Sequence, residues 1–109
     1  MERPLSAPEQ ARVFAALGDR TRLSLLSKLC GGQARSITQL TWDFALTRQA
    51  ITKHLRVLQD AGLVHCRRSG RESRFEFSPE PLTQAKKYLE LVSEQWDASL
   101  RRLKAFVER

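Results

Sequence analysis

The stretch LTRQAITKHLRVLQDAGLV, residues 46–64, decides the fold because its apolar and polar residues separate at helical spacing. Ile51, Leu55 and Leu58 recur every three or four residues, which places them on one face of a helix. Thr47 precedes this pattern and is a candidate N-cap residue. The opposite side and its flank are polar or cationic: Gln49, Thr52, Lys53 and Arg56. We therefore expect a short helix with an apolar back and a basic front.

The residues before this stretch predict three more helices. Ser6 and Glu9 have the spacing of a capping box and start the first helix. Asp19 caps the second helix, whose inward face is assigned to three leucines: Leu23, Leu26 and Leu29. The third helix spans residues 37–44. A short helix, a turn and the basic-fronted helix then form a helix-turn-helix over about residues 37–61.

Two short segments of alternating polarity, LVHCRR and SRFEFS, lie on either side of Gly70 and predict a β-hairpin over about residues 63–78. Phe75 and Phe77 share one face of its second strand. The hairpin is rich in arginine: Arg67, Arg68, Arg71 and Arg74. A helix-turn-helix followed by a basic hairpin is a winged helix-turn-helix, so the expected fold class is mainly α with a small β-hairpin.

A long amphipathic helix is predicted from about residue 80 to 108. Residues at alternating spacings of three and four form a heptad-like seam: Leu82, Ala85, Leu89, Val92, Trp96, Ser99, Leu103 and Phe106. A helix of about 28 residues is about 42 Å long, which exceeds what the rest of a small domain covers. We therefore expect Trp96 and Leu103, in its outer half, to contact a second copy of the chain.

The composition fits one globular domain, which we take as residues 1–109. Lys and Arg number 19 against 12 acidic residues, giving a formal net charge of +7. That excess indicates a polyanionic partner, either nucleic acid or an anionic membrane surface. No apolar run approaches the ~20 residues of a membrane span, and the N-terminus does not resemble a secretory signal. We expect a cytoplasmic protein without a membrane partner.

The basic helix front and the basic hairpin together favour double-stranded DNA as the partner. The major groove admits one α-helix, and the amide of Gln49 is suited to adenine while Lys53 or Arg56 is suited to guanine. The expected base-reading residues are Gln49, Thr52, Lys53 and Arg56. The residues expected to hold the backbone or enter the minor groove are Thr47, Arg48, Arg67, Arg68, Arg71 and Arg74. A merely solvated helix is the plain alternative, and the arginine-rich hairpin argues against it.

Three successive segments resemble signatures of the ArsR/SmtB family of winged-helix transcriptional repressors: FAALGDRTRLSLLSKL, QAITKHLRVLQDAGLV and RRSGRESRFEFSPEPL. The resemblance covers roughly residues 8–107. It implies a homodimeric bacterial repressor on a palindromic operator, with residues 47–60 as the recognition helix and residues 63–78 as the wing. It also implies a dimer interface between the first and last helices, to which we assign Val13, Leu89, Val92, Trp96, Leu103 and Phe106.

The chain departs from the family pattern at two places. Ala45 stands in a turn where members often have Gly, and a positive φ there costs an alanine about 1 kcal/mol. Many members sense metals through Cys or His ligands, but the matching segment here is SIT, residues 36–38. The last helix has carboxylates without histidine: Glu90, Glu94 and Asp97. Because Zn²⁺ and soft metals prefer Cys and His donors, we expect no metal site and no cofactor.

The cysteines and histidines admit more than one interpretation. Cys30 and Cys66 are most simply small core residues, and the alternative is a redox-responsive DNA-binding regulator that uses one or both thiols. His54 is expected to pack on the flank of the recognition helix or to contact a phosphate. His65, in the first strand of the hairpin, has no partner that the sequence indicates.

The sequence contains no nucleophile elbow, phosphate-binding loop or carboxylate pair spaced for acid–base chemistry. We therefore expect no catalytic residues and no enzymatic activity. The rival from another class is a winged-helix dimer that serves as an adaptor for an acidic protein, because the fold alone does not determine function.

Overall fold

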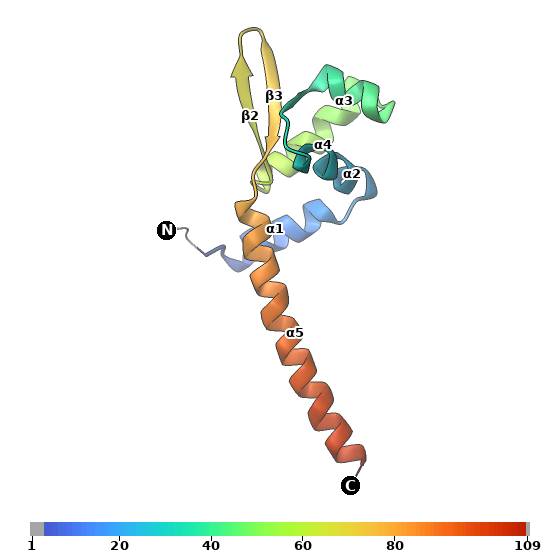
Figure 1. Cartoon of the computed structure of the whole chain (residues 1–109), viewed down its shortest axis with the longest axis vertical. Coiled ribbons are helices and arrows are strands. Elements are labelled where there is room, and N and C mark those ends of the chain that lie inside the picture. The colour runs from blue at the N-terminus through green and yellow to red at the C-terminus, as the bar shows by residue number, and fades with distance from the viewer. Residues whose placement is uncertain (1–3, 109) are drawn as a thin grey trace.

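The computed structural model describes residues 4–108 and shows a winged helix-turn-helix body from which one long helix projects (Figure 1). The elements in chain order are α1 (Ala7–Leu17), α2 (Arg20–Cys30), β1 (Arg35–Ser36), α3 (Ile37–Phe44), α4 (Arg48–Asp60), β2 (Val64–Ser69), β3 (Glu72–Phe77) and α5 (Glu80–Val107). The molecule measures 68 × 34 × 23 Å because α5 extends well beyond the body. The predicted fold class is confirmed.

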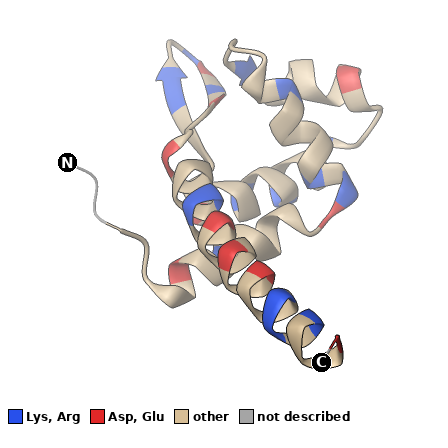
Figure 2. Ribbon diagram, turned by 60° about the horizontal axis from the view of Figure 1, so that its bottom comes forward, with Lys and Arg blue, Asp and Glu red and all other residues tan. Residues whose placement is uncertain are grey.

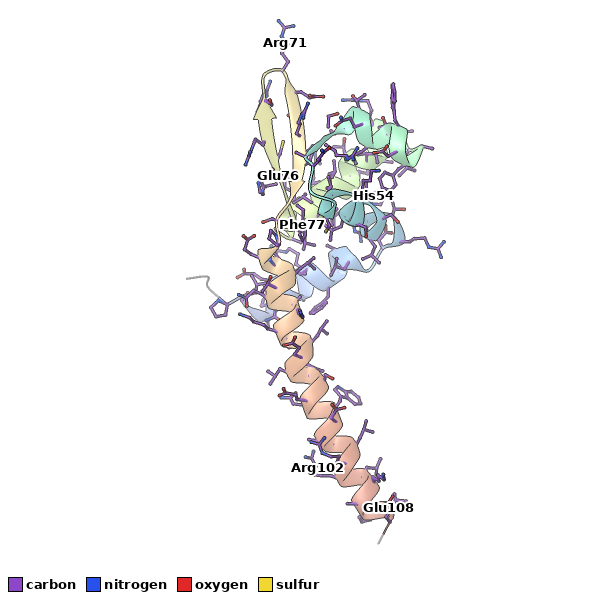
Figure 3. All side chains as sticks on the ribbon, in the orientation of Figure 1. His54, Arg71, Glu76, Phe77, Arg102 and Glu108 are labelled. Atoms are coloured by element: carbon purple, nitrogen blue, oxygen red, sulfur yellow. The ribbon has the colours of Figure 1, made fainter. Side chains whose placement is uncertain are left out.

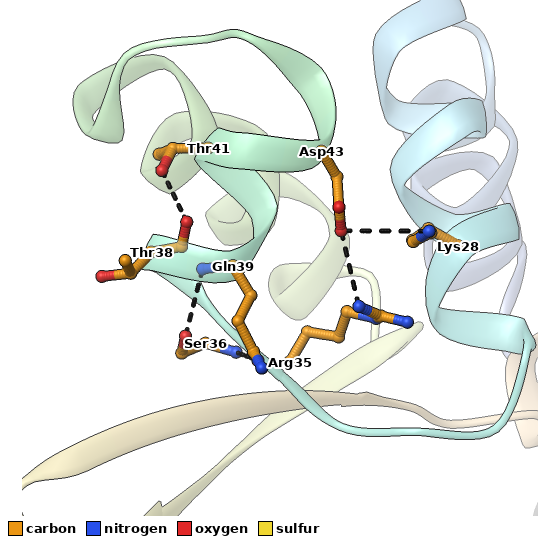
Figure 4. A network of polar contacts seen from close by, with 7 residues as sticks. All are labelled: Lys28, Arg35, Ser36, Thr38, Gln39, Thr41 and Asp43. Atoms are coloured by element: carbon orange, nitrogen blue, oxygen red, sulfur yellow. Dashed lines mark hydrogen bonds and ion pairs between the residues drawn. The ribbon is translucent and has the colours of Figure 1, made fainter.

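Side-chain caps fix where the helices begin. The predicted caps Ser6, Asp19 and Thr47 each accept a hydrogen bond from the backbone N–H three residues further on, at 3.3, 3.0 and 3.1 Å. At α3, Ser36 Oγ accepts from the backbone of Gln39 at 3.2 Å, and the Gln39 side chain accepts from the backbone N–H of Ser36 at 2.9 Å (Figure 4). This reciprocal capping box satisfies two N–H groups that the helix itself leaves without a partner.

The core forms where the apolar faces of the helices meet the sheet. Ile51, Leu55 and Leu58 are buried, which confirms the predicted back of α4. On α2, however, Leu23 is 46% exposed, and the prediction that it faces inward is wrong. The buried face is formed instead by Leu25 together with the other two predicted leucines. At 100° per residue, Leu23 points on the order of 100° away from the centre of that face.

The hairpin is part of a three-stranded antiparallel sheet with the order β1-β3-β2. Phe75 on β3 lies between Arg35 of β1 and Cys66 of β2 and is buried. Cys66, in contrast, is exposed, as is Cys30 at the end of α2, so the expectation that both cysteines are core residues is wrong. The physical reason at Cys66 is that β2 is an edge strand that buries only its first residue, Val64.

The turn between α3 and α4 runs through Ala45, which has φ 51° and ψ 37°. This is the left-handed conformation that was expected to cost an alanine about 1 kcal/mol. It ends α3 within one residue and lets Thr47 cap α4 two residues later. The turn therefore keeps its geometry without a glycine.

Candidate nucleic-acid interface

The front of α4 presents the side chains that the sequence assigned to base reading. Gln49, Lys53 and Arg56 are exposed, and within residues 4–108 none of them has a side-chain hydrogen bond or an ion pair. Thr52 is half-buried and its hydroxyl donates to the backbone oxygen of Arg48 at 2.7 Å. Three of the four side chains therefore extend freely from a helix whose other face is locked into the core.

The start of α4 is held against α3 by a contact that the sequence did not predict. Arg48 Nη1 donates to Thr38 Oγ1 at 2.7 Å, across ten residues of chain. The backbone oxygen of Thr38 in turn accepts from the hydroxyl of Thr41 at 2.6 Å (Figure 4). The Arg48 side chain, expected to hold a phosphate, is thus restrained before any DNA binds.

The four arginines of the wing, defined as β2 and β3 with their turn, differ in their surroundings. Arg67 pairs with Glu76 at 2.8 Å, and Arg74 pairs with Glu72 at 3.2 Å. Because Arg67 and Arg74 lie directly opposite each other on the two strands, these acids offset the repulsion between them. In the described part of the chain Arg68 and Arg71 have no acidic partner, and Arg71 points outward from the tip of the wing (Figure 3).

Both histidines have acidic partners. His65 Nε2 lies 2.5 Å from Glu76 Oε1, the same oxygen that Arg67 contacts, so a partner is present that the sequence did not indicate. His54 is half-buried on the flank of α4, and its Nδ1 lies 3.9 Å from a carboxylate oxygen of Asp19. This agrees with the packed role expected for His54.

A polar groove separates the wing from the helix-turn-helix. One wall is formed by the start of α3 with Arg48, the other by the turn and first residues of β3; its lining residues are Ser36, Ile37, Thr38, Arg48, Arg71, Glu72 and Ser73. Its volume is about 460 Å³. Nothing in the sequence singled out Thr38 or Ser73, because the groove exists only once the wing folds beside α3.

The residues assigned to a dimer interface fall into two groups. Leu89, Trp96, Leu103 and Phe106 are exposed on the projecting part of α5, and Val92 is half-buried. Trp96 is 65% exposed and Phe106 is 69% exposed. Val13 is only 1% exposed because it packs in the core of its own chain, so its assignment to the interface is corrected. Four further apolar residues of α5 are exposed: Tyr88, Leu91, Leu100 and Val107.

No group of three or more His, Cys, Asp or Glu side chains within residues 4–108 is arranged to hold a metal ion. Both cysteines are free thiols. Partial burial raises the pKa of the Cys30 thiol above its ordinary value. A raised pKa lowers the thiolate fraction of Cys30 at neutral pH.

Comparison with known proteins places this arrangement among transcriptional regulators. A family model described as a helix-turn-helix domain matches residues 17–67. The uncharacterized HTH-type transcriptional regulator YuzN of Bacillus subtilis strain 168 is 43% identical over 76 residues, which cover 64% of this chain and 83% of YuzN.

Solved structures agree with that likeness. An ArsR-like transcriptional regulator from Rhodococcus sp. RHA1 superimposes with a TM-score of 0.80 at 38% identity, over 91% of this chain and 92% of the other. The homodimeric winged helix-turn-helix DNA-binding domain of Mb0332 from Mycobacterium bovis gives a TM-score of 0.63 at 25% identity, over 87% and 84% of the two chains.

Proposed function

The chain belongs to the ArsR family of winged helix-turn-helix transcriptional regulators, which bind DNA. From this premise we propose that it is a homodimeric repressor that binds a palindromic operator in the cytoplasm. The observation that carries the proposal is the two-faced α4. Its back is formed by three buried apolar residues. Its front, where Gln49, Lys53 and Arg56 have no side-chain partner within residues 4–108, lies beside a basic wing. The formal net charge of +7 fits a polyanionic partner.

We assign base reading to the front of α4. In the major groove the amide of Gln49 matches the donor and acceptor pattern of adenine, and Lys53 or Arg56 matches the two acceptors of guanine. Thr52 lies at the flank, where its hydroxyl bonds to the helix backbone and its methyl group is available to a thymine methyl. These side chains need no acid to be displaced before they meet a base.

Backbone and minor-groove contacts are assigned to the helix start and the wing. Thr47 and Arg48 lie at the positive end of the α4 dipole, which favours a phosphate. In the wing we rank Arg68 and Arg71 above Arg67 and Arg74, because the latter two must share their charge with Glu76 and Glu72. Arg71, at the tip, has the greatest reach (Figure 3).

The dimer is assigned to the outer part of α5. Beyond Ala85, which is buried in the body, the seam continues to Phe106, and its large apolar side chains are exposed except for half-buried Val92. Along α5 the charged residues are acidic in its middle and basic towards its outer end (Figure 2). At 100° per residue, Glu90, Glu94 and Arg101 lie on the side opposite the seam. An apolar stripe of this length on a projecting helix is expected to be covered by another protein surface, and a second copy offers an identical one.

The side-chain sizes along the seam favour an antiparallel pair. With a two-fold axis between Asp97 and Ala98, Trp96 meets Ser99 of the second copy, Val92 meets Leu103 and Leu89 meets Phe106. Each layer then joins a larger to a smaller side chain, as close packing requires. A parallel pair stacks Trp96 on itself and leaves Ser99 facing Ser99.

The test is a salt titration of binding to the DNA upstream of the protein's own gene, against a shuffled fragment of equal length. Counterion release makes both affinities fall with salt. A preference of about 10³ or more for the natural fragment at physiological salt is the expected result. Equal affinity for both fragments, or no binding to either at low salt, contradicts operator recognition there and favours another target.

A further inference from the structure

The groove between the wing and the helix-turn-helix is lined by groups suited to binding a phosphate. Arg48 supplies a guanidinium on one wall, and two hydroxyl residues, Thr38 of α3 and Ser73 of β3, also line the groove. Its only acidic lining residue, Glu72, is already engaged by Arg74 through both Nε and Nη2 at 3.2 Å. An anion that enters the groove therefore meets cationic and hydroxyl groups without an uncompensated carboxylate.

Thr38 has a double role in that geometry. Its Oγ1 accepts from Arg48 Nη1 at 2.7 Å, which uses a lone pair of the hydroxyl and leaves its proton free to donate. A guanidinium carries five N–H groups, so Arg48 keeps donors for a second acceptor while one is bound to Thr38. The two side chains can thus hold one phosphate oxygen or two adjacent oxygens between them.

We propose that Thr38 is a positioning residue for DNA binding: it fixes Arg48 at the mouth of the groove, and together they hold one backbone phosphate between the wing and the helix-turn-helix. This inference rests on the proposed function, since the anion is taken to be a phosphate of the operator. Its physical gain is preorganisation, because a restrained arginine loses less side-chain entropy when it binds. The contact also joins the wing and α4 to the same stretch of DNA backbone.

The experiment replaces the operator phosphates one at a time by neutral methylphosphonates and measures binding by fluorescence anisotropy. For the wild-type protein, one phosphate in each half-site is expected to weaken binding about tenfold when neutralised, as for loss of a hydrogen bond to a charged group. Thr38→Val keeps the shape of the side chain but removes the hydroxyl. It is expected to bind intact operator about tenfold more weakly per half-site and to ignore neutralisation of that phosphate.

Two further variants separate positioning from folding. Thr38→Ser retains the hydroxyl and is expected to restore both the affinity and the sensitivity to that phosphate. Arg48→Gln is expected to lose sensitivity to the same phosphate as Thr38→Val. Thr38→Val and Arg48→Gln should each reduce the slope of log affinity against log salt concentration by about 1 per half-site. Thr83→Val is the matched control, because the Thr83 hydroxyl donates to a backbone oxygen at the start of α5, outside the groove, and this variant should bind as the wild type does.

The inference is overturned if the wild type binds its operator and Thr38→Val retains full affinity. It is also overturned if Thr38→Ser is as weak as Thr38→Val, or if Thr38→Val and Arg48→Gln lose sensitivity to different phosphates. A wild-type protein that bound no DNA at low salt would instead contradict the proposed function, and this inference with it. Melting curves of every variant exclude a trivial loss through unfolding.

Discussion

Asp19 Oδ2 lies 3.9 Å from Nδ1 of His54, so the residue that caps α2 also faces the flank of α4. The same carboxylate oxygen accepts the backbone N–H of Arg22 at 3.0 Å. That hydrogen bond is the main cause that lowers the pKa of Asp19, and the charges of Arg22 and His54 act in the same direction. A single carboxylate therefore joins the start of α2 to the side of α4.

This relationship predicts how stability depends on acid. Because the pKa of Asp19 is lowered in the folded state, the unfolded chain binds its proton first. The contribution is complete above the usual aspartate pKa of about 3.9 and is lost as the pH falls through the lower, folded value. In denaturant titrations from pH 6 down to 3, Asp19→Asn should show a weaker decline in stability than the wild type. Asp60→Asn, at an exposed carboxylate, is the control, and an unchanged decline in Asp19→Asn contradicts the assignment.

Burial in the core predicts unequal losses of stability when two leucines, both expected from the sequence to face inward, are replaced by alanine. Leu55 is 1% exposed, so Leu55→Ala should lower the free energy of unfolding by about 2–5 kcal/mol. Leu23 is 46% exposed, so Leu23→Ala should lower the free energy of unfolding by less than about 1 kcal/mol. Urea denaturation at one fixed protein concentration measures both, since dissociation of the proposed dimer would make stability depend on concentration. Similar losses in the two variants would mean that Leu23 is buried in solution.

The left-handed Ala45 predicts a substitution that stabilises the protein. Glycine adopts φ 51° without the clash that an alanine suffers, so Ala45→Gly should raise the free energy of unfolding by about 0.5–1 kcal/mol. Ala61, the C-cap of α4, has φ −83°, where glycine only adds freedom to the unfolded chain. Ala61→Gly should therefore be destabilising by about 0.4–1 kcal/mol. Effects of the same sign at both positions, measured in urea, would contradict this account of the turn.

Local periodicity explains why α4 was predicted closely. Its apolar spacing, the cap at Thr47 and the end near Ala61 are all encoded within a few residues, and the observed helix is Arg48–Asp60. The expected wing over residues 63–78 agrees with β2 and β3 for the same reason. Two-residue β1 leaves no periodic signal, so the third strand was missed.

Contacts between residues far apart in the chain could not be predicted from local sequence patterns. Alternation along β2 suggested that Cys66 is buried like Val64, but only the base of that edge strand reaches the core. The bond between Arg48 and Thr38 depends on the turn at Ala45, and the groove beside it depends on where the wing lies. The candidate arginines were therefore identifiable by type, whereas the partners that restrain them required the structure.

The base reading that we propose for α4 predicts losses of affinity that depend on the DNA sequence. Lys53→Ala and Arg56→Ala should each weaken binding to the operator by about 1–3 kcal/mol and leave binding to shuffled DNA nearly unchanged. The reason is that a bidentate pair to a base is lost only where that base is present. Lys87→Ala removes the same charge from α5 and is the matched control. Equal weakening on operator and shuffled DNA would show that these side chains touch phosphates only.

The antiparallel pairing of α5 that we propose for the dimer predicts which engineered cysteines meet. In a chain with Cys30 and Cys66 replaced by serine, the combined Val92→Cys and Leu103→Cys substitutions should give a covalent dimer on mild oxidation. Each single substitution should not, because residue 92 faces residue 103 of the second copy and not itself. Non-reducing gel electrophoresis measures the product. The control combines Val92→Cys with Arg101→Cys, because Arg101 lies two residues before Leu103 and so on the opposite side of the helix from the seam. Rapid cross-linking of Val92→Cys alone would instead establish a parallel pair, in which every residue meets its own counterpart.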